Sequence, residues 1–435
     1  MTKYRTKIDL LVDYFERAEC SREEGEMGIE VEHFVLDKET LKATSYHREE
    51  GIEDLLRNLA KGNWEPKLEE DNIVGLKGER ARVALEPGGQ LELSVLPQSS
   101  IEELETIYLD FVKEVSSILD PWDKNLFCLG YQPRSRVDEI SFLPKKRYEY
   151  MYEYFSDKGK YAYNMMKGTA SIHVNFDYFD ERDYEKKNLV ANILSPLVYT
   201  VLDNSPYFEG SVFTRPNLRQ LIWENCDADR CGYPVGLFSG QFGYEDYAEY
   251  LLNTPPIAYE KEGELVYSKD KLLKDILLED LNPTSGELDY LLTTVFPDVR
   301  TKNHLEIRMG DSLPYPYGFA YLCFWKGLLY SEKNLENLYS RYEGISQEEF
   351  LERKRRMTER GVGTGGQSGV FSTYRDLLDL AEQGLKPGEK QYLEPLIVLA
   401  NEELTPKQKT LNSVSSEKAE RLSWCNLSEI INRVG

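Results

Sequence analysis

The chain has 435 residues, of which 41% are hydrophobic and 12% aromatic, and its formal net charge is −23. This hydrophobic content is typical of a globular protein and excludes a disordered one. The absence of any run of about 18 apolar residues argues against a membrane span. The negative charge argues against general nucleic-acid binding, which needs clustered Lys and Arg, but leaves room for a local site for an anionic small molecule. The N-terminal segment lacks an apolar core followed by a cleavage site, so we expect a cytoplasmic protein.

The first candidate site residues fall on a strand that follows an N-terminal helix. Apolar spacing predicts a helix over residues 5–20, and Gly28–Asp37 then alternates between apolar and polar residues. The alternation places Glu30 and Glu32 on one face of the strand, about 6–7 Å apart. Two such carboxylates repel each other unless water or a cation lies between them. The strand therefore indicates either a cation site or a solvated acidic face.

The second acidic stretch is Ala84–Val95, in which two short apolar/acidic alternations meet at Pro87-Gly88-Gly89. In an unbroken strand, Glu86 and Glu92 would lie roughly 20 Å apart and could not share a ligand. They become neighbours if the Pro-Gly-Gly segment redirects the chain, because Gly reaches backbone angles that other residues avoid. A surface hairpin with a solvated acidic face is the alternative. Before this stretch we predict a helix over 49–61 and a strand over 72–78, and after it a helix over 101–119.

Two later strands carry polar residues in the same alternating way. Ser171, His173 and Asn175 share one face of the strand 170–177, and Glu306 and Arg308 share one face of the strand 303–309. A His that shares a face with Asn and Asp is a candidate metal ligand, although a lone His is usually structural.

The remaining segments are predicted to be mainly helical. Residues 144–155 fit a helix or an extended segment, and helices are expected over 189–202, 245–252, 271–279 and 320–330 and through most of 336–435. The G-x-G-x-x-G spacing within Arg360–Gly369 follows a basic run and not a strand, so it predicts a flexible linker and not a dinucleotide site.

Arginines follow the segment 203–206 in an otherwise acidic chain. Arg215, Arg219 and Arg230 lie there, and Arg side chains bind carboxylates and phosphates in a two-point fashion. Surface ion pairs are the alternative interpretation. If the four polar-faced strands belong to one antiparallel sheet, they form a carboxylate-rich concave surface that divalent cations would stabilise. The residues therefore predict metal-assisted phosphoryl chemistry without a P-loop.

Taken in order, these stretches resemble the glutamate–cysteine ligases (γ-glutamylcysteine synthetases) of the plant and proteobacterial type. The likeness runs over roughly residues 25–410, and the run Leu85-Glu-Pro-Gly-Gly-Gln90 is its most specific part. Further matching pieces are Gly28–Glu32, Ile73–Lys77, Leu91–Ser94, Asn204–Pro206, Leu218–Trp223, Asp229–Arg230, Phe296–Arg300, Leu305–Arg308, Phe324–Tyr330 and Ala381–Leu385.

The resemblance implies an α+β fold like that of the glutamine synthetase catalytic half. In this fold a curved antiparallel sheet forms a funnel-like active site, with helices packed outside. We expect one catalytic domain over residues 1–435, with its core at about 25–335 and a mainly helical part at 336–435. The implied reaction uses ATP to phosphorylate the γ-carboxylate of L-glutamate, and the amino group of L-cysteine then displaces phosphate, which is the first step of glutathione biosynthesis. ATP and Mg²⁺ are the implied cofactors, and we expect a monomer or homodimer without nucleic-acid or membrane partners.

The resemblance also assigns roles to individual residues. It implies that Arg308 contacts phosphate and that Arg219 binds the α-carboxylate of glutamate, both as catalytic residues. The implied metal ligands are Glu30, Glu32, Glu92, His173 and Glu306; Glu86 and Arg308 are implied to bind the cofactor, and Arg219, Asn175, Trp325 and Arg230 the amino-acid substrate.

Two segments depart from the plant pattern near the expected substrate site, Val212–Asn217 and Thr254–Tyr259. A γ-glutamyl ligase that uses another amino acid or amine is therefore the nearest alternative. A divalent-metal hydrolase or a metal-binding protein without ligase activity is a more distant one.

Overall fold

A nine-stranded antiparallel sheet forms the centre of the molecule, in the order β14-β15-β7-β1-β5-β4-β3-β2 with β6 also paired to β1. The structure is a computed structural model, and it describes residues 3–279, 283–360, 367–413 and 415–434. The strands of this sheet are β1 (Met27–Asp37), β2 (Glu65–Glu69), β3 (Asn72–Lys77), β4 (Ala81–Leu85), β5 (Leu91–Gln98), β6 (Lys124–Phe127), β7 (Ser171–Phe176), β14 (Val299–Thr301) and β15 (Leu305–Asp311). The predicted antiparallel sheet is thus confirmed.

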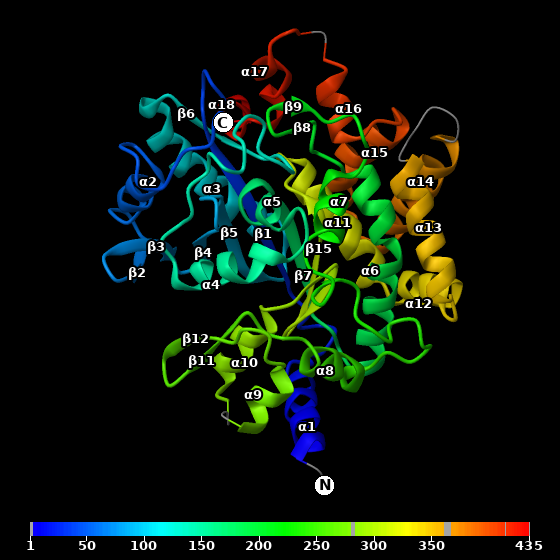
Figure 1. Cartoon of the computed structure of the whole chain (residues 1–435). Helices are drawn as coiled ribbons and strands as arrows, with labels where there is room; N and C mark the ends of the chain where they lie inside the picture. Colours follow the sequence, from blue (N-terminus) through cyan, green and yellow to red (C-terminus); the bar gives the residue numbers. More distant parts are fainter. Residues whose placement is uncertain (1–2, 280–282, 361–366, 414, 435) are drawn as a thin grey trace.

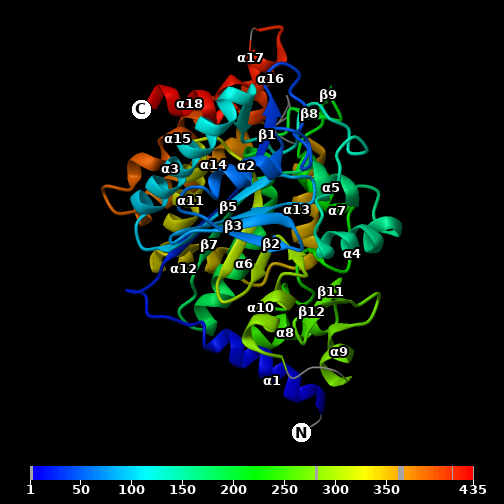
Figure 2. The same cartoon turned by 90° about the vertical axis from the view of Figure 1, so that its left-hand side faces the viewer.

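Helices surround the sheet and cover its apolar face (Figures 1 and 2). Those before residue 230 are α1 (Lys3–Glu16), α2 (Ile52–Leu59), α3 (Ile101–Leu119), α4 (Lys146–Tyr154), α5 (Ala162–Gly168), α6 (Glu181–Val201) and α7 (Leu218–Glu224). The later ones are α8 (Tyr244–Leu252), α9 (Leu273–Glu279), α10 (Ser285–Leu292), α11 (Tyr317–Leu329), α12 (Glu332–Tyr342), α13 (Gln347–Arg360), α14 (Gln367–Gly384), α15 (Glu394–Asn401), α16 (Pro406–Leu411), α17 (Lys418–Arg421) and α18 (Leu427–Val434). Helix α11 is buried along its length and packs against α12, α14 and α15, which ties the C-terminal helices to the core.

Short strands complete the fold. They are β8 (Tyr207–Phe208), β9 (Ser211–Val212), β10 (Cys231–Gly232), β11 (Ala258–Lys261), β12 (Glu264–Tyr267) and β13 (Phe296–Pro297).

The predicted elements match the observed ones closely where a capping residue or a regular period marks them. Helix α3 spans the predicted residues, and Ser100 caps it by accepting a hydrogen bond from the backbone N–H of Glu103. The segment 144–155 resolves as helix α4. Helix α6 begins earlier than predicted because Asp180 caps it, accepting a hydrogen bond from the backbone N–H of Asp183 at 2.7 Å. Most of the predicted linker, residues 361–366, lies outside the described residues.

The Pro-Gly-Gly segment makes the tight hairpin that brings β4 and β5 together. The backbone N–H of Gly89 donates to Glu86 O at 2.8 Å, and that of Glu86 donates to Gln90 O at 3.0 Å. Gly89 has φ +84°, a left-handed conformation that Gly adopts without a steric penalty. Leu85 and Leu91 then pair across the hairpin, so Glu86 and Glu92 lie on the same part of the sheet.

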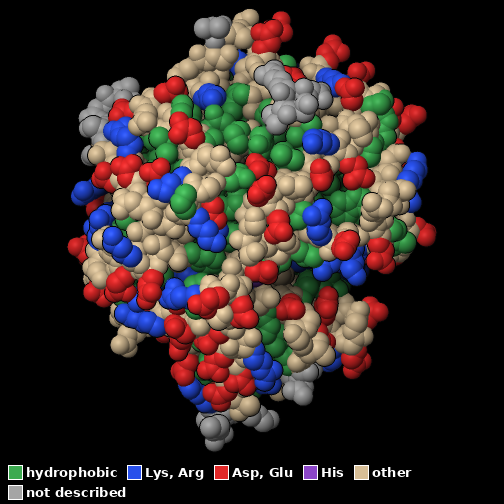
Figure 3. All heavy atoms as spheres, turned by 180° about the vertical axis from the view of Figure 1, so that it is seen from behind, with side chains coloured by type: hydrophobic (Ala, Val, Ile, Leu, Met, Phe, Trp, Pro, Cys, Tyr) green, Lys and Arg blue, Asp and Glu red, His purple; other side chains and the backbone are tan. Residues whose placement is uncertain are grey.

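The part of the molecule below the sheet in Figure 1 contains α1, α8, α9, α10 and the hairpin β11–β12. Seen from behind, this part carries many Asp and Glu side chains (Figure 3), in agreement with the net charge of −23. Within the described ranges, no helix combines the length and the apolar character that crossing a membrane requires.

Candidate active site

A cavity of about 370 Å³ lies over the polar face of the sheet. Its walls combine acidic, basic and apolar side chains from β1, β5, β7, β15 and the helices α4, α5 and α7. The lining residues include Glu30, Glu32, Glu86, Glu92, Ser94, Lys145, Arg147, Tyr148, Met151, Met165, Met166, Ser171, His173, Arg219, Trp223, Phe296, Arg300, Lys302 and Arg308. Most of the predicted site residues therefore meet in one place.

The register of the central strands aligns the carboxylates in a row. Glu32 on β1 lies directly opposite Glu92 on β5, and Glu30 on β1 lies opposite His173 on β7. One strand further, Glu306 on β15 lies opposite Asn175. Directly paired residues on neighbouring strands have Cβ atoms about 4.5–5.5 Å apart, so adjacent members of this row interact strongly.

At the β5 end of the row, burial and repulsion between carboxylates outweigh the opposing effect of the Arg219 guanidinium on Glu32. Ser171 donates to both oxygens of Glu32, through its backbone N–H and its Oγ, each at 2.8 Å. Burial, and then the Glu86 carboxylate, raise the pKa of Glu32 to about 7. Burial and the carboxylates of Glu30, Glu86 and Glu32 together raise the pKa of Glu92 well above its ordinary value. This acidic group, Glu32, Glu86 and Glu92, is called the β5 cluster below.

At the β15 end the protein supplies its own cations. Glu306 is fully buried and forms ion pairs with Arg300, Lys302 and Arg308, each at 2.7 Å. Burial opposes its ionisation, but the three cations outweigh burial and hold the pKa of Glu306 well below its ordinary value. Glu306 and these three cations are called the β15 cluster below.

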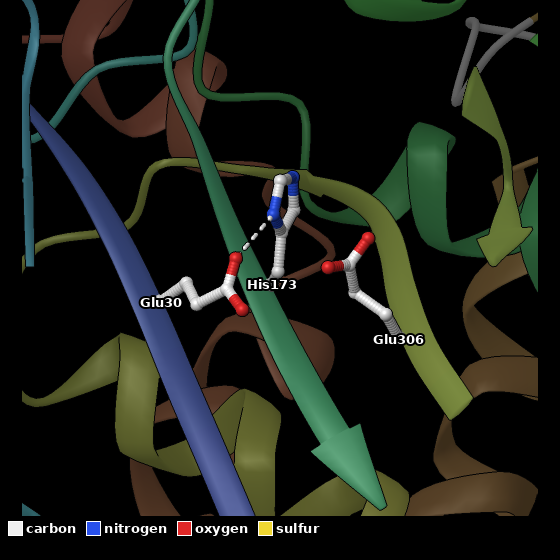
Figure 4. Close-up of side chains that lie close together, drawn as sticks. All are labelled: Glu30, His173 and Glu306. Carbon is white, nitrogen blue, oxygen red and sulfur yellow. Dashed lines mark hydrogen bonds and ion pairs between the residues drawn. The ribbon is translucent and has the colours of Figure 1, made fainter. Parts of the chain in front are cut away.

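The side chains of Glu30 on β1 and His173 on β7 lie close to that of Glu306 (Figure 4). His173 Nδ1 lies 3.3 Å from Glu30 Oε2, and Asn175 donates to Glu30 Oε1 at 2.9 Å. Burial acts against ionisation of Glu30, but Lys302 and His173 together outweigh it, and the pKa of Glu30 falls to about 2. Burial, and then the Arg308 guanidinium, lower the pKa of His173 to about 4, so the ring is neutral near pH 7.

Among the described residues, one group of donors lies close enough together to hold a divalent cation. One ligand atom each from Glu30, His173 and Glu306 lie within 4.8 Å of one another, although the oxygens of Glu306 are already bonded to cations. The β5 cluster offers carboxylate oxygens whose charge is poorly compensated, and oxygen ligands are those that Mg²⁺ prefers. A cation there would relieve the repulsion that raises the pKa of Glu32 and Glu92.

Arg219 and Trp223 form the α7 side of the cavity. Arg219 donates through Nη2 to Arg308 O at 2.8 Å, whereas its Nε and Nη1 are buried without a hydrogen-bond partner. The Arg219 and Arg308 guanidinium carbons lie 5.4 and 5.9 Å from the Trp223 ring centre. Two free donors on a buried Arg are costly unless a ligand accepts from them.

Three of the four predicted substrate residues, Arg230, Trp325 and Asn175, do not line the cavity, and neither does the predicted metal ligand Glu306. Arg230 is fully buried, and four of its five N–H donors bond to Asp227, Thr294 O, Tyr154 and Pro255 O. Trp325 is fully buried in α11, where it packs against Tyr321 and Phe324. Neither residue lines the cavity, and their substrate contacts stay predictions.

The amide of Asn175 and the ring of His33 have partners outside the cavity lining. Asn175 does not line the cavity and acts through its hydrogen bond to Glu30. His33 faces the apolar side of the sheet, where its ring bonds to Leu91 O and Tyr108 Oη, which makes it a structural His.

Several lining residues were absent from the predicted site. Ser171 and Lys302 sit on or next to the polar-faced strands, and the alternation of these strands could have identified them. Lys145, Tyr148, Met151, Met165 and Met166 come from α5 and the start of α4, and their helical segments carry no pattern that indicates a cavity.

Comparison with known proteins agrees with this geometry. The glutamate–cysteine ligase family 2 (GCS2) model matches residues 26–358. The chain is 30% identical over 423 residues to the chloroplastic glutamate–cysteine ligase B of Oryza sativa subsp. japonica, covering 95% of this chain and 84% of that protein. It is 29% identical over 427 residues to the chloroplastic glutamate–cysteine ligase of Arabidopsis thaliana, covering 96% and 81%.

Solved structures show the same fold at low sequence identity. The glutamate–cysteine ligase of Francisella tularensis in complex with AMP gives a TM-score of 0.57 at 13% identity, over 94% of this chain and 88% of that one. A bifunctional glutathione synthetase from Pasteurella multocida gives 0.52 at 12% identity, over 99% and 54%. The family model and the curated relatives agree on a carboxylate–amine ligase, and the solved structures share its fold. The chain belongs to the glutamate–cysteine ligase family.

Proposed function

We propose that this protein is an ATP-dependent glutamate–cysteine ligase that joins the γ-carboxylate of L-glutamate to the amino group of L-cysteine, as the first step of glutathione biosynthesis. The observation that carries the proposal is the row of carboxylates along the cavity. One end of this row is rich in carboxylates and the other end is rich in cations, and the chain belongs to the glutamate–cysteine ligase family. An in-line phosphoryl transfer between two anions needs this combination, because cations must screen both the nucleotide and the acceptor carboxylate.

Mg²⁺ is the proposed metal, with Glu32 and Glu92 as its first ligands and Glu86 beside them. Glu30, His173 and Glu306 form the second proposed group of ligands. When bound, Mg²⁺ would reduce charge repulsion between ATP phosphates and the attacking carboxylate. The Ser171 and Ser94 hydroxyls would orient the carboxylates, because they donate to Glu32 and Glu92, respectively, at 2.8 Å.

Residues of the α7 and β15 sides would hold the substrates. Arg219 has two buried N–H groups without partners, and we propose that it binds the α-carboxylate of glutamate. Arg308 is held beside the row by Glu306, and we propose that it contacts the phosphoryl group during transfer. Asn175 would support the site indirectly by fixing Glu30.

The reaction would proceed in two balanced steps. A γ-carboxylate oxygen of glutamate attacks the γ-phosphorus of ATP, and ADP leaves with the electrons of the broken P–O bond. The amine nitrogen then attacks the acyl carbon, inorganic phosphate leaves, and the nitrogen loses a proton to give the amide.

ATP turnover with glutamate and a panel of amines tests the proposal. We expect release of ADP that requires Mg²⁺, glutamate and an acceptor, with L-cysteine preferred over other amino acids. ADP release that depends on glutamate but prefers another amine would contradict the named acceptor. ATP turnover that is indifferent to glutamate would contradict the ligase itself.

The wider setting of the protein is also proposed. We propose that it acts in the cytoplasm as a monomer or homodimer, and that residues 1–435 form one catalytic domain. Packing of α11 against α12, α14 and α15 supports the last point, because the C-terminal helices cover the same core as the sheet.

A further inference from the structure

The cationic side chains around the cavity differ in their partners. Arg300, Lys302 and Arg308 all bond to Glu306 at the β15 end. Lys145 approaches from the β4 end, where its Nζ donates to Leu85 O at 3.3 Å and to Tyr148 Oη at 3.4 Å. Among the residues that the structure describes, no carboxylate lies within ion-pair distance of the Lys145 ammonium. Lys145 therefore lines the cavity as a cation whose hydrogen-bond partners are both neutral groups.

The surroundings of Lys145 fix its ammonium group at the edge of the β5 cluster. The Tyr148 ring centre lies 4.8 Å from Nζ, and the Tyr148 hydroxyl donates to Leu85 O at 2.5 Å. Leu85 directly precedes Glu86, so this network joins the start of α4 to the hairpin that carries Glu86. Burial lowers the pKa of Lys145, although the Glu86 carboxylate opposes this effect.

An ammonium group has three N–H donors, and two of those of Lys145 are directed to Leu85 O and Tyr148 Oη. The third donor and most of the charge remain available on the cavity side. Charge-assisted hydrogen bonds to phosphate or carboxylate oxygens are the interactions that such a group makes most strongly.

We propose that Lys145 is a substrate-contacting residue that binds an oxyanion in the cavity, either a phosphate oxygen of the nucleotide or a carboxylate oxygen of an amino-acid substrate. The inference rests on the proposed ligase function for the identity of these molecules. It assigns to the β4 end of the cavity an anion contact that is separate from those proposed for Arg308 and Arg219.

Steady-state kinetics of the 435-residue protein test whether the charge of Lys145 contributes to substrate binding. We expect K145M to raise the KM of one anionic substrate by about 10-fold or more, whereas K145R, which keeps the charge, recovers part of the loss. A raised KM for ATP identifies a phosphate contact, and a raised KM for glutamate or the acceptor identifies a carboxylate contact. K146M is the matched control, because Lys146 is the exposed neighbour that lies near Glu149, and its kinetics should stay within 2-fold of wild type.

Binding measured by calorimetry in the presence of Mg²⁺ separates this inference from the ligase proposal. The probes are ADP, inorganic phosphate and L-glutamate, none of which requires turnover. We expect K145M, or K145Q if K145M does not fold, to bind one probe at least about 10-fold more weakly than wild type. Equal binding of every probe by wild type and variant would overturn the inference, as would equal losses in K145M and K145R or a wild type that binds none of them.

Discussion

The β5 and β15 clusters lie on one sheet, with β7 between the strands that carry them, yet their charges are balanced in opposite ways. In the β15 cluster three cations surround one buried carboxylate, and the pKa of Glu306 is low. In the β5 cluster three carboxylates meet, and the pKa values of Glu32 and Glu92 are raised. The difference agrees with the proposal that an external cation completes the β5 cluster, whereas side chains of the protein itself neutralise the carboxylate of the β15 cluster.

The largest expected effect is on catalysis at the β5 cluster. We expect E92Q to lower glutamate-dependent ATP turnover by more than about 100-fold, because a neutral amide binds a divalent cation poorly. Circular dichroism should show an unchanged fold. The exposed Glu264 on β12 offers a matched control, and E264Q should retain wild-type turnover. Retained activity of E92Q with an unchanged Mg²⁺ dependence would refute the proposed ligand role.

Without divalent cations, removal of one carboxylate should change the free energy of unfolding in opposite directions in the two clusters. We expect E306Q to lower the free energy of unfolding by about 3 kcal/mol, because it leaves buried cations without their counter-charge. E92Q should leave stability unchanged or raise it by up to about 1 kcal/mol, because it removes one of several repelling charges. Chemical denaturation in EDTA measures both. Equal destabilisation by the two variants would show that both clusters are internally balanced.

The pH dependence of stability should sharpen the same comparison. The pKa of Glu32 is about 7 in the folded protein and ordinarily 4.5, so the folded state holds this proton more tightly. Protonation of Glu32 therefore stabilises the folded state fully below about pH 4.5. This stabilisation, up to about 3 kcal/mol, is lost as the pH rises through about 7. We expect E32Q to remove this component when unfolding in EDTA is measured between pH 5 and 8. Parallel wild-type and E32Q curves would contradict the raised pKa.

The smallest expected effect concerns the hairpin that positions the β5 cluster. A Cβ on Gly88 would lie 2.7 Å from Lys167 O and 2.8 Å from Lys167 Cα, so G88A must move the hairpin away from α5. We expect a loss of about 1–3 kcal/mol in the free energy of unfolding, together with a raised Mg²⁺ requirement for turnover. G388A is the control, because a Cβ there meets nothing within 4 Å. Equal behaviour of the two variants would exclude a positioning role for this turn.

The sequence predicts the polar faces of the strands but not their order in the sheet. Alternation places Glu30 with Glu32 and Ser171 with His173, since the strand period is local. The pairing of Glu32 with Glu92 depends on long-range register, which no local pattern encodes. The turn at Gly89 was predictable because only its conformational freedom lets the two acidic segments meet.

The resemblance predicts more of the site than the pattern alone, and some of the residues it names do not line the cavity. It correctly indicated that Arg219 and Arg308 line the same cavity as the carboxylates. It could not indicate that Arg230 and Trp325 are enclosed by neighbouring elements, because burial depends on the packing of distant segments. Lys145 and the cavity methionines come from helical segments without a distinctive period, so only the folded structure brings them to the site.

Calorimetric titration of the metal-free protein with Mg²⁺ tests the central claim most directly, because it asks whether the β5 cluster needs an external cation. We predict that wild type binds Mg²⁺ and that the double variant E32Q/E92Q binds it at least about 10-fold more weakly, while E264Q binds like wild type. Undiminished Mg²⁺ binding by E32Q/E92Q would contradict the account.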